Sequence, residues 1–219
     1  MFKSVTLYTN KLKSLKRFYM NLLEWDLVEA DNDRFTVKVG SSQLSFVESE
    51  RPYFYHFAIN IPGNQFSMMK YWLKDRVTLN REEGRDEVYF QSFDADSMYF
   101  EDPAGNIVEL IGRRKRDLFG DLTKESFIDI SEVGVATPYV TEVGELLQDN
   151  GIPLRNGTEV NPDELNFLGK DDKFVVLVPL HRRWYFSKKQ SEVAPLEFTV
   201  NEKTFKIDVE GKIETIEEN

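Results

Sequence analysis

The chain has 219 residues, of which 41% are hydrophobic and 30% are charged, and this composition predicts a globular protein of one or two ordinary domains. Its formal net charge of -10 argues against nucleic acid and acidic membranes as partners, because both favour clustered Lys and Arg. The absence of cysteine excludes disulfides and thiolate metal sites. The sequence shows neither an apolar run long enough to span a bilayer nor a signal-peptide pattern, so we expect a cytoplasmic protein with a small-molecule or protein partner.

The first 50 residues predict one β-α-β-β-β unit. Residues 4–9 alternate apolar and polar side chains, which is typical of a strand. Leucines and aromatic residues recur at helical spacing over residues 11–25. Three further strands are expected at 25–29, 34–39 and 43–48, which completes a first module over residues 1–50.

The same order recurs over residues 51–115. A strand at 53–61 is followed by a turn and an amphipathic helix at 65–76. The expected strands that follow are 77–79, 87–93, 97–101 and 107–111. Two copies of one arrangement in tandem indicate a structural repeat.

A third, degenerate module and tail are expected over residues 125–219. Its strands are predicted at 130–137, 165–168, 174–179 and 184–186, with a helix beginning near Thr141. The tail strands at 196–200 and 204–207 are expected to finish this module's sheet. The predicted fold is therefore of the α+β class, with tandem βαβββ modules around a cupped mixed sheet.

Two residues of the second module stand out as metal-ligand candidates. In the strand at 53–61, His56 and Asn60 point away from the face that Phe57, Ile59 and Ile61 should bury. Glu109 interrupts an apolar strand, where an unpartnered charge would cost several kcal/mol. If these strands lie in one sheet, His56 and Glu109 converge in one groove although 53 residues separate them (109 - 56). The pair is either part of a divalent-metal site or a hydrogen-bonded His-Glu pair, since two ligands are fewer than a firm metal site uses.

The sequence resembles the vicinal oxygen chelate superfamily, which includes glyoxalases, extradiol dioxygenases and the fosfomycin and bleomycin resistance proteins. The resemblance rests on paired β-α-β-β-β units, on Y-H-F-A-I-N at the start of the second, and on F-E-D-P-A-G-N-I-V-E-L at its end. The helix segment L-K-S-L-K-R-F-Y-M-N-L-L is also similar. The resemblance to the superfamily covers residues 1 to about 115 well and the third unit only loosely.

The resemblance implies that His56 and Glu109 bind a divalent Fe, Mn, Zn, Ni or Co ion, and that Glu109 is a catalytic residue. The equivalent positions of the first module carry Ser4 and Ser45, which are poor metal ligands and are instead candidates for substrate binding. In the third module the first-strand position is Glu132, but its last strand has no acidic residue, so that module is expected to be structural.

Two further residues are candidates for substrate binding. Asn60 shares the face of His56, and Arg113 follows the Glu109 strand, where it could reach an anionic group at the groove mouth.

Three functions follow from these observations. The first is a metal-dependent enzyme of the glyoxalase or dioxygenase kind, which chelates a small oxygen-rich substrate. The second is a metal-free binding or sequestering protein, and the third is a regulatory or interaction module. A homodimer is compatible with each, because the facing modules can come from one chain or from two.

Overall fold

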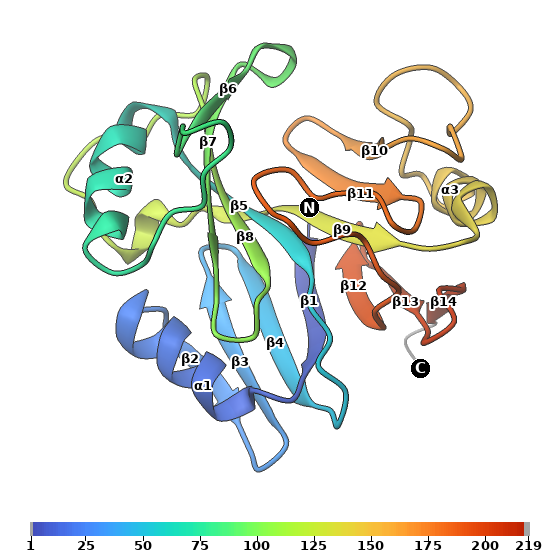
Figure 1. The fold of residues 1–219 in the computed structure, drawn as a ribbon, viewed down its shortest axis with the longest axis horizontal. Helices are drawn as coiled ribbons and strands as arrows, with labels where there is room; N and C mark the ends of the chain where they lie inside the picture. The colour runs from blue at the N-terminus through green and yellow to red at the C-terminus, as the bar shows by residue number, and fades with distance from the viewer. Residues whose placement is uncertain (1, 217–219) are drawn as a thin grey trace.

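The structure, a computed structural model, describes residues 2–216 and contains two seven-stranded mixed sheets with few helices (Figure 1). This is the α+β architecture that the sequence predicts. Within residues 2–216, none of the helices combines the length and the apolar character needed to cross a membrane.

The first sheet has the strand order β14-β13-β12-β1-β4-β3-β2. Its strands are β1 (Phe2–Thr9), β2 (Leu27–Ala30), β3 (Arg34–Val39), β4 (Ser42–Glu48), β12 (Leu196–Val200), β13 (Lys203–Ile207) and β14 (Ile213–Ile216). The sequence suggested that the tail completes the sheet of the third module, and this prediction is wrong. The tail joins the first module instead, through antiparallel pairing of β12 with β1.

The second sheet has the order β10-β11-β9-β5-β8-β7-β6. Its strands are β5 (His56–Pro62), β6 (Val88–Phe90), β7 (Ala95–Glu101), β8 (Ile107–Arg113), β9 (Asp129–Ala136), β10 (Asn166–Lys170) and β11 (Lys173–Val178). The first strand of the second module, β5, pairs antiparallel with the first strand of the third, β9. The second and third modules thus share one sheet, and any site on it is built by both.

Within residues 2–216, three α-helices pack on these sheets. They are α1 (Leu12–Arg17), which continues as a π-helical turn (Phe18–Leu22), α2 (Phe66–Lys74) and α3 (Val140–Asp149). In α2 the buried residues Phe66, Met69 and Leu73 recur every three or four positions, so that one stripe faces the core. The segment at 184–186 was predicted to be a strand, but it lies in a turn-rich loop outside the regular strands.

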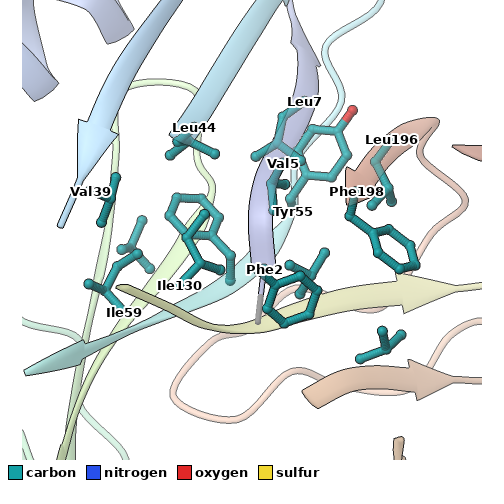
Figure 2. Packing of buried hydrophobic residues seen from close by; sticks show 14 of the residues in the cluster. Phe2, Val5, Leu7, Val39, Leu44, Tyr55, Ile59, Ile130, Leu196 and Phe198 are labelled. Atoms are coloured by element: carbon teal, nitrogen blue, oxygen red, sulfur yellow. The ribbon is translucent and has the colours of Figure 1, made fainter. Parts of the chain in front are cut away.

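A hydrophobic core lies between the two sheets (Figure 2). Val5 and Leu7 of β1 and Ile59 of β5 belong to the same buried cluster. Because side chains alternate along a strand, the residues between them point to the opposite faces of their sheets. The predicted alternation in β5 is confirmed, since Phe57, Ile59 and Ile61 are in the core, and His56 is left on the face turned away from it.

Candidate metal centre

Three potential ligand residues lie on one face of the second sheet. In the strand register, Ala58 of β5 pairs with Glu109 of β8 on one side and with Glu132 of β9 on the other. His56 is two residues before Ala58 and shares its face. The ligand atoms of His56, Glu109 and Glu132 all lie within 4.8 Å of one another, and all three residues are buried. The sheet register therefore brings together a nitrogen donor and two carboxylates.

The orientation of His56 is fixed by its main-chain partner. Its Nδ1 lies 3.1 Å from the main-chain oxygen of Ile107. A carbonyl oxygen only accepts, so Nδ1 carries the proton. Burial lowers the pKa of His56 to about 4, so the ring is neutral at pH 7. Its Nε2 then presents a lone pair towards Glu109 Oε2, which is 3.6 Å away.

The two carboxylates are both held in a setting that disfavours their charge. Burial raises the pKa of Glu109, and the nearby hydroxyls of Ser97 and Tyr99 offset part of that rise. The pKa of Glu132 is raised further, because the charge of Glu109 adds to the effect of burial.

Together these groups require a proton or a cation between them. A neutral imidazole nitrogen and two carboxylates are all acceptors, and they would otherwise repel one another. A set of one nitrogen and two oxygen donors suits Mn, Fe, Co, Ni or Zn. The residues present therefore fit a divalent ion of this class.

Arg113 and Asn60 form a buried hydrogen-bonded network next to Glu132. The Arg113 guanidinium donates from Nε to Asn60 Oδ1 at 3.2 Å and from Nη2 to Ser131 Oγ at 3.0 Å. It also lies 3.6 Å from Glu132 Oε1 and is buried. Asn60 Nδ2 in turn donates to Asp129 Oδ1 at 2.7 Å. This network supports Glu132, and neither Arg113 nor Asn60 lines the pocket at the three candidate ligands.

The structure does not bring Ser4 and Ser45 to this site. Both lie in the first sheet, where Ser4 Oγ donates to Thr199 Oγ1 at 3.1 Å. Ser45 Oγ lies 2.8 Å from the hydroxyl of Thr36.

Glu132 is the residue that sequence reasoning missed as a ligand. Its place in the first strand of the third module was recognised, but the lack of an acidic residue in the last strand suggested a structural module. The available signal was the equivalence of Glu132 to His56 as a first-strand residue in the repeat.

A pocket of about 400 Å³ opens over the candidate ligands. Its apolar wall is mainly aromatic. Besides the three candidate ligands, the lining residues are Phe90, Ser92, Phe93, Tyr99, Ile111, Leu165, Phe167, Val176, Arg182, Trp184 and Tyr185. Its volume lies within the usual range for small-molecule sites, about 300–1,000 Å³.

The loop at residues 180–191, here termed the strap, covers one side of this pocket. Trp184 packs on the His56 ring with centroids 5.0 Å apart. Glycine at position 134 makes this possible, because a Cβ there would lie 2.9 Å from Trp184 Cη2 and 3.0 Å from the His56 main-chain oxygen. Phe186 stacks on Tyr99 at 4.8 Å.

Two ion pairs fasten the strap to the second module. Arg183 Nη2 lies 2.6 Å from Glu82 Oε1, and Lys189 Nζ lies 2.9 Å from Glu101 Oε2. The strap therefore joins the third module to the second across the mouth of the site.

Comparisons with known proteins find relatives of this architecture. Residues 130–182, from β9 into the strap, match the family model for the toxoflavin-degrading enzyme. A putative dioxygenase from Bacillus subtilis has a similar structure, with a TM-score of 0.57 and 13% identity over 81% of this chain and 63% of that one. The chain has the vicinal oxygen chelate fold.

Shorter members of this fold superpose on about half of the chain. A lactoylglutathione lyase from Agrobacterium tumefaciens aligns over 52% of this chain and 95% of its own, with 16% identity and a TM-score of 0.44. A glyoxalase/bleomycin resistance protein/dioxygenase from Alicyclobacillus acidocaldarius aligns over 50% and 89%, with 22% identity and a TM-score of 0.39. No curated protein matches the chain by sequence.

Proposed function

We propose that the chain is a metal-dependent enzyme of the glyoxalase and dioxygenase kind, acting on a small molecule that has two adjacent oxygen atoms. The observation that carries the proposal is the buried cluster of His56, Glu109 and Glu132, whose ligand atoms lie within 4.8 Å of one another beneath an open pocket. These three residues would hold a divalent ion. When bound, that ion supplies Lewis-acid chemistry, which stabilises negative charge on substrate oxygens.

The side chains around the cluster have distinct roles in this proposal. The main-chain oxygen of Ile107 holds the His56 ring in one tautomer, with Nε2 turned to the centre. Glu109 is the proposed proton acceptor, because its carboxylate lines the pocket at the place where the two substrate oxygens would bind. Burial and Glu109 keep the pKa of Tyr99 well above its ordinary value, so its phenol stays neutral beside that carboxylate. Trp184 excludes water from one side of the His56 ring.

Metal content tests this proposal directly. Protein purified without chelators or a histidine tag is analysed for bound metal, before and after incubation with Mn, Fe, Co, Ni or Zn salts. We expect about one equivalent in the wild type, and loss of that metal in His56→Ala. His181→Asn is a matched control, because His181 is the other histidine of the chain and is exposed.

A wild-type protein that takes up none of these metals would contradict the proposal. The aromatic pocket would then support the second candidate, a metal-free protein that binds or sequesters a small molecule. Ligand screening by thermal shift would test that function.

A further inference from the structure

The walls of the pocket indicate the shape of its ligand. Six aromatic side chains line it: Phe90, Phe93, Tyr99, Phe167, Trp184 and Tyr185. Aromatic side chains favour stacked or edge-to-face contact with another ring. A cavity of about 150 Å³ is enough to hold benzene, so a pocket of about 400 Å³ accommodates a ring with several substituents.

Arg182 is the cationic residue that lines this pocket, and it lacks a counter-charge. Among residues 2–216, its guanidinium makes no ion pair, and its hydrogen bond is from Nη1 to the main-chain oxygen of Arg183 at 3.2 Å. Two other strap cations are paired, Arg183 with Glu82 and Lys189 with Glu101. A partly buried guanidinium without an acidic partner favours binding of an external anion, for which its planar fork is well suited.

The charges around the pocket favour an anionic ligand. Two ionised carboxylates, Glu109 and Glu132, contribute -2, and a divalent ion balances them with +2. Arg113, 3.6 Å from Glu132 Oε1, and Arg182 then leave the site with a positive net charge, since a guanidinium stays protonated at neutral pH.

From these observations, and on the basis of the metal centre proposed above, we infer that Arg182 is a specificity-determining residue. It binds a carboxylate substituent on a planar aromatic ring whose two adjacent oxygens face His56, Glu109 and Glu132. The aromatic walls select the ring, and Arg182 selects its charge.

A pair of probes that differ in one carboxylate tests this inference. Catechol and 3,4-dihydroxybenzoate share a ring and two adjacent oxygens. Their dissociation constants are measured by calorimetry on the full chain loaded with Mn²⁺. We expect the wild type to bind 3,4-dihydroxybenzoate about tenfold to a hundredfold more tightly than catechol, as a charge-assisted hydrogen-bonded pair predicts.

Two variants show whether Arg182 is responsible. In Arg182→Gln we expect the two probes to bind within about twofold of each other, with the affinity for catechol unchanged. Lys188→Gln is the matched control, because it removes the same charge from an exposed position of the strap outside the pocket, and it should keep the wild-type preference. Should Arg182→Gln not fold, Arg182→Lys is used; it should keep only part of the preference, because an ammonium lacks the bidentate fork.

Failure of this inference is distinguishable from failure of the proposed function. Absence of Mn²⁺ binding in the wild type would refute the metal centre itself. If Mn²⁺ binds, equal affinities for the two probes, or a preference that survives Arg182→Gln, would overturn the role of Arg182. Lack of saturable binding of both probes to the loaded protein would overturn the assignment of an aromatic ligand.

Discussion

The substitution Glu132→Gln separates a metal ligand from a structural carboxylate. Glutamine keeps the size of the side chain, but it removes the negative charge that Glu132 brings from β9 to the cluster. Leaving a buried charge without its partner costs about 3–5 kcal/mol. Applied to a metal ion that loses one of two carboxylates, this cost predicts an affinity about 10²- to 10⁴-fold lower than that of the wild type.

The same substitution should have the opposite effect on the metal-free protein. Burial and the charge of Glu109 raise the pKa of Glu132 above its ordinary value, so the folded state binds its proton more tightly than the unfolded state does. Stability from such a group is complete below the ordinary pKa, about 4.3, and is lost as the pH rises towards the folded-state pKa. The wild type without metal should therefore lose stability between about pH 4.3 and neutral pH, and Glu132→Gln should lose less of it.

Calorimetric titration with Mn²⁺ and thermal unfolding in the presence of a chelator measure the two effects. Glu164→Gln is the control, since Glu164 is an exposed glutamate in the same module. Wild-type Mn²⁺ affinity in Glu132→Gln would refute the assignment of Glu132 as a ligand. A pH dependence of metal-free stability identical in variant and wild type would refute the argument from its buried charge.

Three other outcomes follow from the contacts. Asp102→Ala should lower the free energy of unfolding by about 3 kcal/mol in urea titrations. The reason is that the buried carboxylate accepts four hydrogen bonds, including one from Tyr19 Oη at 2.6 Å. A loss below about 1 kcal/mol would contradict this. Ser45→Ala should leave Mn²⁺ affinity within about twofold of the wild type, since Ser45 lies in the other sheet; a large loss in calorimetry would show that the first sheet reaches the site. Trp184→Ala should destabilise the protein by about 3–4 kcal/mol, because Trp184 is buried against His56. The same variant should speed amide exchange in the strap. Unchanged exchange would mean that other contacts hold the strap.

Side-chain alternation made two of the three candidate ligands predictable from sequence. It placed His56 opposite the core face of β5, and it placed Glu109 in the same groove although the two strands are far apart in the chain. The structure brings His56 Nε2 within 3.6 Å of Glu109 Oε2. Such an inference succeeds because the period of a strand is a local property that each sequence segment carries by itself.

The choice of neighbouring modules is not a local property, and there the sequence was insufficient. Pairing of β9 with β5 brings Glu132 opposite Ala58. The register of this pairing shifts immediately afterwards, between Ala58 and Ile59. A shift of one residue decides which face a side chain occupies, and hydrophobic pattern alone does not reveal it. The same limit explains why the tail was expected beside the third module, whereas β12 pairs with β1.

The strap shows a different limit. Trp184, Tyr185 and Phe186 are a run of aromatic residues, which is typical of a strand. His181 and Phe186 instead adopt positive φ values of 65° and 52°, which end any extended run. The packing of Trp184 on His56 and of Phe186 on Tyr99 is a tertiary contact that overrides local propensity.

The two sheets share one plan, and their comparison shows what the site depends on. The β1 and β4 strands pair in parallel like β5 and β8, so Ser4 occupies the place of His56 and Ser45 that of Glu109. Thr6 pairs with Glu197 of β12 as Ala58 pairs with Glu132 of β9, and Glu197 therefore keeps the third position.

In the first sheet these positions are satisfied without a metal. Ser4 and Ser45 bond to neighbouring threonine hydroxyls, and Glu197 Oε1 accepts a hydrogen bond from Tyr8 Oη at 3.1 Å. In the second sheet the same positions carry an imidazole and two carboxylates, whose ligand atoms lie within 4.8 Å of one another. The fold presents the same three positions twice, and among residues 2–216 it is the second set whose residues could hold a cation.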